Sequence, residues 1–176
     1  MDTKVRTFEL TMWPHMRAAY NLARWLVRND HDAEDVVQES FLKAYKAQES
    51  FRGSEPKTWM LSIVRNTAMD FLRRVKSSGP ATVDDPELEP HDHSPNPERA
   101  LLEQSRRDQV RQAISKLAPE FREAIVLREM EGLSYKEIAS VLSIPMGTVM
   151  SRLARARSQL LVELGGSTKE VQHDLP

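Results

Sequence analysis

The chain has 176 residues, 40% of them hydrophobic and 29% charged, with a net charge of −1, which fits one ordinary globular domain or two small ones. It contains no cysteine, so disulfides, thiol catalysis and cysteine-ligated zinc are excluded. The apolar runs are short and residues 1–6 lack the core of a signal peptide, so we expect a cytoplasmic chain without membrane insertion.

The first predicted helix covers about residues 7–29, where apolar side chains recur at helical spacing until a polar run predicts a turn. Asp32 is suited to capping the next helix, because carboxylates near a helix N-terminus interact favourably with its dipole. The apolar residues of this second helix can face inward, which leaves Asp35, Gln38 and Glu39 on an acidic outer face. Such a face is usually only solvated, but it could also meet a basic partner.

A third long helix is predicted to begin near residues 54–56 and to run through Arg74, with Pro56 in its first turn. Its apolar residues form a buried stripe that includes Trp59. Cations and an amide remain on the outside, and such groups can neutralise a single strand and hold an unstacked base. These residues are Lys57, Arg65, Asn66 and Arg73. Taken alone, they are also typical of an ordinary solvent-exposed helix surface.

The middle of the chain is acidic and rich in proline. Residues 77–100 carry six acidic side chains, one basic side chain and five of the ten prolines, so this segment should not fold by itself. We therefore expect an all-α protein with two small helical domains, at residues 1–76 and 99–165. A flexible linker at residues 77–98 joins them, and a polar tail follows at residues 166–176. Nothing near His91 and His93 would fix a coordination geometry, so no metal site is predicted.

The strongest local pattern is a helix-turn-helix in residues 132–157. Ser134 and Glu137 are spaced as a capping box for the first of its helices, and Pro145 punctuates the junction with the second. The small residues Ala139 and Gly147 would allow the two backbones to approach closely.

The outer face of the second of these helices suits a DNA major groove. Between residues 146 and 164 the charged side chains are Arg152, Arg155 and Arg157 against a single Glu163. Arginine can grip phosphate or the edge of guanine with two hydrogen bonds. The alternative is an amphipathic hairpin whose arginines are merely solvated.

Several motifs occur together in order, over roughly residues 8–164. This set resembles the extracytoplasmic-function sigma factors of bacterial RNA polymerase, and the matching segments are residues 32–39, 51–53, 58–60, 65–68, 132–139 and 145–149. The resemblance implies a promoter-melting domain that recognises the minus-ten element, a linker, and a helix-turn-helix domain that recognises the minus-thirty-five element.

The resemblance also implies roles for individual residues. The acidic face would dock on core polymerase through Asp32, Asp35, Gln38 and Glu39. Asn66 would capture a flipped base of the non-template strand, with Lys57, Trp59, Arg65 and Arg73 contributing to minus-ten binding. The minus-thirty-five duplex would meet Thr148, Ser151, Arg152 and Arg155. Because no sensory domain is fused to the chain, a separate anti-sigma factor is the expected regulator.

Two other classes of protein compete with this interpretation. A stand-alone helix-turn-helix repressor would need a dimerisation face, but only a short polar tail follows residue 164. An all-helical hydrolase would need a catalytic constellation, a phosphate loop or a nucleophile elbow, and the sequence shows none. We therefore expect neither an enzyme nor a cofactor.

Overall fold

The computed structural model of the chain describes residues 3–53, 55–77 and 97–165. All regular elements in these ranges are helical, which confirms the predicted all-α class. Most of the predicted linker, residues 77–98, lies outside the described residues. Only its two ends are described, since α4 ends at Ser77 and α5 begins at Pro97. The predicted polar tail and the two histidines of the linker also lie outside them.

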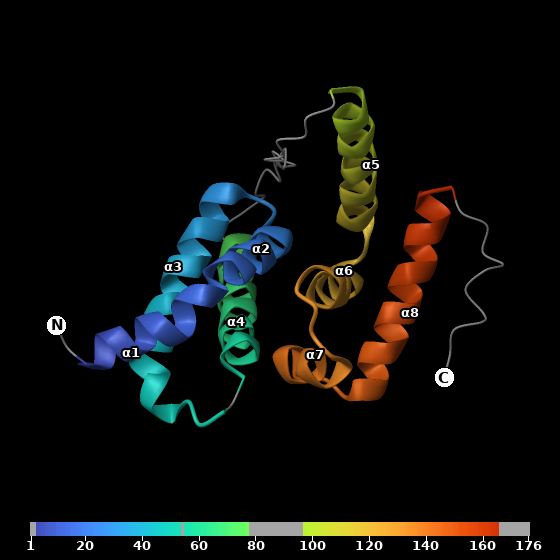
Figure 1. Cartoon of the computed structure of the whole chain (residues 1–176). Coiled ribbons are helices and arrows are strands. Elements are labelled where there is room, and N and C mark those ends of the chain that lie inside the picture. The colour runs from blue at the N-terminus through green and yellow to red at the C-terminus, as the bar shows by residue number, and fades with distance from the viewer. Residues whose placement is uncertain (1–2, 54, 78–96, 166–176) are drawn as a thin grey trace.

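The N-terminal half is a bundle in which α2, α3 and α4 pack against one another, with α1 at its edge (Figure 1). The bounds of its helices are α1 Thr3–Met12, α2 Met16–Val27, α3 Asp30–Ala47 and α4 Pro56–Ser77, with 3-10 turns η1 Trp13–His15 and η2 Gln48–Ser50. A single helix over residues 7–29 was the wrong prediction. Pro14 has no backbone N–H to donate, and the 3-10 turn η1 separates α1 from α2 at this point.

The caps of the N-terminal half differ in one detail from the sequence-based expectation. Asn29, and not Asp32, is the N-cap of α3, because the Asn29 side-chain oxygen accepts a hydrogen bond of 3.0 Å from the Asp32 backbone N–H. Helix α4 begins at Pro56 as expected and ends at Ser77, three residues beyond the predicted Arg74.

The C-terminal half contains α5 Pro97–Lys116, α6 Pro119–Ile125, the π-helical turn η3 Val126–Met130, α7 Tyr135–Leu142 and α8 Met146–Glu163. Helices α6 and α7 both pack on α8 (Figure 1). The pair α7 and α8 is the predicted helix-turn-helix. Ser143 closes α7 in a left-handed conformation with φ 54°, and the backbone N–H of Ile144 donates to the Ala139 carbonyl at 3.1 Å.

Gly147 is not needed for a close approach of the two helices. A Cβ atom at Gly147 would meet no atom within 4 Å beyond its chain neighbours and the backbone of its own helix, so the expectation that this glycine lets the two helix backbones approach was wrong. Ser143 is the C-cap of α7 and Pro145 is the N-cap of α8, so the turn between the two helices is only a few residues long.

The capping box of α7 is confirmed. The Ser134 hydroxyl accepts from the Glu137 N–H at 3.2 Å, and the Glu137 carboxylate accepts from the Ser134 N–H at 2.7 Å. We expect Ser134→Ala to lower the free energy of unfolding by about 1 kcal/mol, because one N–H loses its acceptor. Ser140→Ala, on the exposed face of the same helix, is the control and should change it by less than about 0.5 kcal/mol. Urea unfolding measures both, and equal effects would contradict the capping role.

The two halves lie against each other. Helix α4 contacts α7, and α2 contacts both α6 and η3. The buried apolar residues of the two halves form one continuous cluster, from Met12 in α1 to Ala156 in α8. The packing therefore brings the predicted minus-ten helix beside the predicted helix-turn-helix.

Candidate functional site

The acidic face of α3 is exposed at two of its four predicted residues. Asp35 and Gln38 are exposed, whereas Asp32 is half-buried at the first turn of the helix. Asn29 caps α3, so the helix begins at Asp30 and its first turn carries the carboxylates of Asp30 and Asp32. Asp35 and Gln38 lie three residues apart and so share one face. This face can meet a basic surface without rearrangement.

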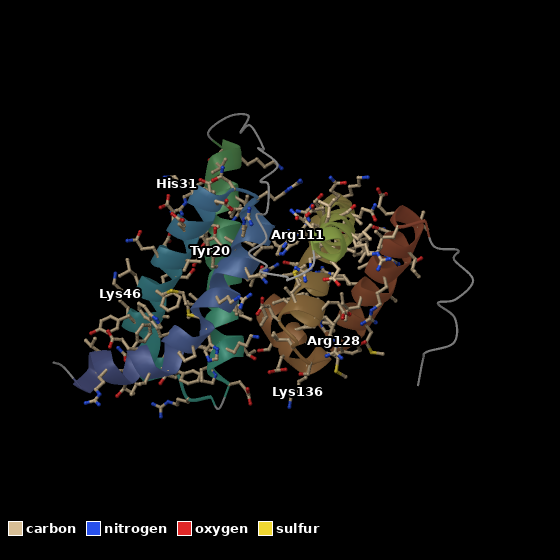
Figure 2. All side chains as sticks on the ribbon, turned by 45° about the horizontal axis from the view of Figure 1, so that its top comes forward. Tyr20, His31, Lys46, Arg111, Arg128 and Lys136 are labelled. Atoms are coloured by element: carbon tan, nitrogen blue, oxygen red, sulfur yellow. The ribbon has the colours of Figure 1, made fainter. Side chains whose placement is uncertain are left out.

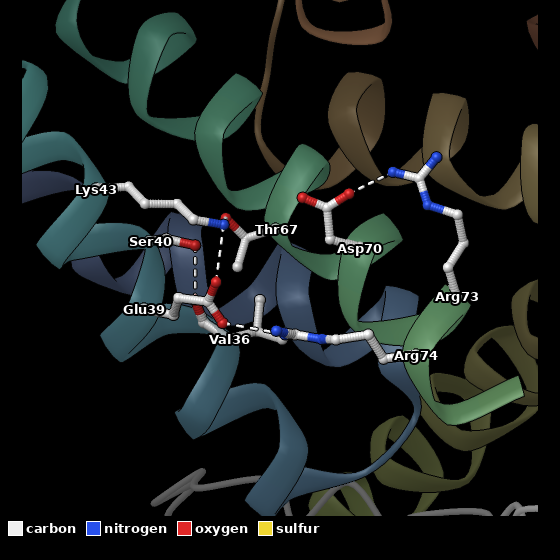
Figure 3. A network of polar contacts seen from close by, with 8 residues as sticks. All are labelled: Val36, Glu39, Ser40, Lys43, Thr67, Asp70, Arg73 and Arg74. Carbon is white, nitrogen blue, oxygen red and sulfur yellow. Dashed lines mark hydrogen bonds and ion pairs between the residues drawn. The ribbon is translucent and has the colours of Figure 1, made fainter. Parts of the chain in front are cut away.

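Glu39 is engaged within the chain (Figure 3). Its carboxylate lies 2.8 Å from the Lys43 ammonium and 3.2 Å from the Arg74 guanidinium, and so joins α3 to α4. The hydrogen bond from Lys43, followed by that from Arg74, holds the pKa of Glu39 below its ordinary value. Lys43 also donates to the Thr67 hydroxyl at 3.2 Å. Glu39 therefore stabilises the contact between the two helices, in addition to any role at the surface.

Helix α4 carries an open pocket of about 560 Å³. Three of the five predicted minus-ten residues line it, namely Arg65, Asn66 and Arg73, and Asn66 and Arg73 are exposed. The Arg73 guanidinium pairs with Asp70 one turn earlier, which keeps the pKa of that carboxyl below its ordinary value (Figure 3). The remaining lining residues mix apolar and charged groups, and they are Met69, Asp70, Leu72 and Lys76. Such a mixture can accommodate the face of a base and the charge of a phosphate.

The other two predicted minus-ten residues lie nearer the start of α4. Trp59 is half-buried and stacks at a tilt on Phe51, with ring centroids 4.9 Å apart, so it fixes the loop before α4. The Lys57 ammonium lies 3.2 Å from the Glu131 carboxylate in the C-terminal half. Burial, followed by the positive charge of Lys57, lowers the pKa of the neighbouring His15. The structure thus does not bring all five residues together.

The outer face of α8 presents Ser151 and Arg155, both exposed, with Thr148 half-buried one turn earlier. The Ser151 hydroxyl donates to the Thr148 carbonyl at 3.0 Å. Two large apolar side chains, Met146 and Met150, are also exposed on this helix, at 53% and 45% of their surface. Cationic, hydroxyl and apolar groups are those that contact phosphates and base edges in a major groove.

Arg152 differs from Arg155. Its side chain is only 24% exposed, and its guanidinium lies 3.2 Å from the carboxylate of Glu123 in α6. Since Val149 and Leu153 are buried, Arg152 lies at the border between the inner and outer faces of α8. Of the two predicted arginines, only Arg155 is fully on the outer face.

Sequence reasoning missed two carboxylates that contact the predicted site. Glu123 and Glu131 have side chains only 5% and 7% exposed, and each contacts a cation of α4. For Glu123 the signal was present in the sequence, because Arg122 and Glu123 stand within the otherwise apolar residues 121–127. Charged residues inside such a run indicate buried, paired groups.

The described ranges contain no group of three or more side chains that could hold a metal ion. None of the helices in these ranges is long and apolar enough to span a bilayer.

Comparison with protein families gives two matches in chain order. Sigma-70 region 2 matches residues 14–78, and Sigma-70 region 4 matches residues 107–160. The first match covers α2 to α4 with the pocket, and the second covers most of the C-terminal half with the helix-turn-helix.

Individual relatives agree with these matches. The chain is 39% identical over 164 residues to the RNA polymerase sigma-H factor of Pseudomonas aeruginosa, covering 88% of this chain and 84% of the relative. It is 42% identical over 137 residues to the ECF RNA polymerase sigma-E factor of Salmonella typhimurium, covering 73% and 72%. Its fold is similar to that of the sigma factor RpoE from Bartonella quintana, solved in complex with the anti-sigma factor NepR, with a TM-score of 0.75 and 27% identity over 91% of this chain and 98% of that one. The chain therefore belongs to the extracytoplasmic-function (ECF) sigma factors, and it is a polymerase-directed transcription initiation factor and not a stand-alone repressor.

Proposed function

We propose that residues 1–76 dock on core RNA polymerase and bind and melt the minus-ten element, while residues 99–165 bind the minus-thirty-five element. Residues 77–98 connect the two modules. The chain acts by binding and positioning, without a covalent step of its own. Because polymerase and chromosomal DNA are in the cytoplasm, the proposal assigns the chain to that compartment.

Docking on core polymerase is assigned to the acidic face of α3. Asp35 and Gln38 are exposed side by side, which supports contact with a basic surface. Asp32 and Glu39 flank them in a supporting role, since Asp32 is half-buried and Glu39 is held by Lys43 and Arg74. Asn66 and Arg73 of α4 are exposed and do not belong to this face, so docking through it does not use them.

Minus-ten binding is assigned to the pocket on α4, and this pocket is the single observation that carries the proposal. Asn66 supplies an exposed amide at a pocket lined by Arg65, Arg73 and Lys76. An amide can hydrogen-bond to the edge of a flipped base while the cations neutralise the phosphates beside it. Trp59 positions the preceding loop, and Lys57 adds a further cation at the start of the helix.

Minus-thirty-five binding is assigned to α8. Arg155 and Ser151 would enter the major groove from the outer face, with Thr148 near the helix N-terminus where phosphates are favoured. Arg152 contributes less directly, because Glu123 already accepts a hydrogen bond from it.

A separate anti-sigma factor is the proposed regulator. The similar sigma factor RpoE was solved in complex with the anti-sigma factor NepR, which supports an analogous partner for this chain. Such a partner would act by covering the docking face of α3 or the DNA-binding surfaces of α4 and α8.

The proposed function is tested by adding the purified chain to core RNA polymerase and genomic DNA and sequencing the 5′ ends of the transcripts. We expect initiation at sites that share two short upstream elements and that core polymerase alone does not use. Transcripts that start at the same positions with and without the chain would refute the proposal.

Replacing Arg155 by Ala is expected to weaken binding of the polymerase complex to its promoters by about 1–3 kcal/mol if the side chain grips a base edge. A phosphate contact would instead lower affinity evenly across sequences and reduce the salt dependence. Arg152→Ala is the matched comparison on the same helix, and a smaller direct effect on specificity is expected from it. Quantitative footprinting at several salt concentrations measures both. Unchanged affinity in both variants would show that another face of α8 meets DNA.

A further inference from the structure

The outer face of α8 begins with a row of apolar side chains. Met146, Met150 and Ala154 are exposed and stand four residues apart, so they follow one another along one side of the helix. The two methionines leave 53% and 45% of their surface exposed, whereas Val149 and Leu153 form the buried side of the same helix. Apolar side chains that are exposed next to one another mark a contact surface more often than single ones do. This apolar row is therefore a candidate contact surface.

The apolar row lies where a recognition helix enters the major groove. In a helix-turn-helix the first residues of the second helix contact the base edges. Met146 is the first residue of α8, directly after the N-cap Pro145, and Met150 lies one turn later. At 1.5 Å per residue the row from Met146 to Ala154 is about 12 Å long, which corresponds to roughly three or four base-pair steps of B-DNA.

The side chains around the row offer few other means of reading bases. Residues 146–151 carry neither a charge nor an amide, so none of them can grip guanine or adenine as Arg, Asn or Gln does. The Ser151 hydroxyl already donates to the Thr148 carbonyl at 3.0 Å. The exposed Arg155 comes five residues after Met150. What the start of α8 offers to the groove is therefore mainly apolar contact.

Thymine is the base that presents an apolar group in the major groove. The edges of the other three bases present hydrogen-bond donors and acceptors there, whereas thymine adds its C5-methyl group. A methionine side chain is unbranched and flexible, so it can pack on such a group at a range of backbone distances. The chemistry of the row therefore matches A·T base pairs whose thymine methyl groups face α8.

Cations beside the row match the charge of duplex DNA. Arg155 is exposed on the same helix, and Lys136 is exposed in α7. Figure 2 shows Lys136 and Arg128 at the end of the C-terminal half that holds α7. The guanidinium carbon of Arg128 lies 5.1 Å from the centre of the Tyr135 ring, and its Nη1 donates to the Leu133 carbonyl at 2.8 Å, which fixes the side chain. Phosphate contacts by such cations position a helix without reading sequence, so base reading at this end is left to the row.

We propose that Met146 and Met150 recognise thymine methyl groups in the minus-thirty-five element, with Ala154 packing beside them. This inference rests on the proposed function, which brings the outer face of α8 into the major groove. Arg155 adds affinity through its own base or phosphate. The minus-thirty-five element of this chain therefore contains A·T pairs at neighbouring positions, where thymine methyl groups face the two methionines.

The first experiment removes the methyl groups from the DNA. Promoters are identified by mapping transcripts made by the chain with core polymerase, and each thymine of the minus-thirty-five element is replaced in turn by deoxyuridine, which lacks only the methyl group. We expect the parent complex to bind about fourfold more weakly for each thymine that faces a methionine, which is the effect of one buried methyl group. Deoxyuridine in the spacer between the two elements should change nothing. Equal affinity for thymine and deoxyuridine at every position of the element would overturn the proposal.

The second experiment assigns the effect to the two methionines. Met150→Ala should lose the discrimination between thymine and deoxyuridine at one position, and Met146→Ala should lose it at a neighbouring one. Met150→Leu keeps a large apolar side chain and should still discriminate by about twofold or more, so it separates methyl recognition from a general defect. Val162→Ala shortens an exposed apolar side chain at the far end of α8 and is the matched control with parental discrimination. Parental discrimination at every thymine in both methionine-to-alanine variants would overturn the proposal.

These outcomes separate the inference from the proposed function. A complex that initiates at the mapped promoters but binds thymine and deoxyuridine alike overturns the reading by methionine alone. If the parent with core polymerase gives no promoter-specific transcripts, the proposed function fails, and the inference fails with it.

Discussion

Asp35→Lys is expected to abolish promoter-specific transcription by the chain with core polymerase. Asp35 is exposed on the docking face of α3, and a lysine there would place like charges against the basic surface proposed to receive it. Such a juxtaposition costs several kcal/mol of binding free energy, on the order of a thousandfold in affinity. Competition for core polymerase with a labelled parent chain measures the loss directly.

The control for Asp35→Lys changes the net charge equally at a distant position. Glu120→Lys, on the exposed side of α6, should compete for core polymerase as the parent does. Asp35 is a better probe than Glu39, because a lysine at position 39 would also break the ion pairs with Lys43 and Arg74 that join α3 to α4. If Asp35→Lys still competes at the parental concentration, core polymerase docks on a different surface.

The local structure was predictable wherever a short-range rule decides it. The capping box at Ser134 and Glu137 was predicted from their spacing, and a helix start near residues 54–56 was predicted from the preference of proline for the first turn. The errors also have local causes. Pro14 interrupts the first helix, and Asn29 takes the cap expected of Asp32 because its side chain reaches the correct N–H from outside the helix.

The contacts between the halves could not be predicted in the same way. Helical periodicity indicates which face of a helix is apolar, but it does not indicate which other helix covers that face. The pairing of Arg65 with Glu123 joins residues 58 positions apart, and that of Lys57 with Glu131 joins residues 74 apart. The sequence therefore indicated cations on α4 and arginines on α8, but not which carboxylates pair with them.

The same contacts change how the predicted DNA-binding residues are interpreted. Arg65 and Lys57 are held by carboxylates, whereas Asn66, Arg73 and Arg155 are exposed. A variant of a held cation alters both the contact between the halves and any contact with DNA, so its effect has two causes. A variant of Asn66 or Arg155 does not break a contact between the halves, so its effect reports on DNA. Asn66 is therefore the best single residue for testing the role of α4 in promoter melting.

Asn66→Ala is expected to leave binding of core polymerase intact and to slow formation of the open complex. The exposed amide is proposed to hydrogen-bond to a base flipped out of the non-template strand. Loss of such a contact is worth about 1–3 kcal/mol, which corresponds to a rate lower by about 5- to 150-fold at 25 °C. A time course of permanganate reactivity at unpaired thymines measures strand opening. Gln109→Ala removes an exposed helical amide from α5, outside the proposed DNA-binding surfaces, and should open promoters at the parental rate. If Asn66→Ala opens them as fast as Gln109→Ala, the pocket on α4 does not hold the flipped base.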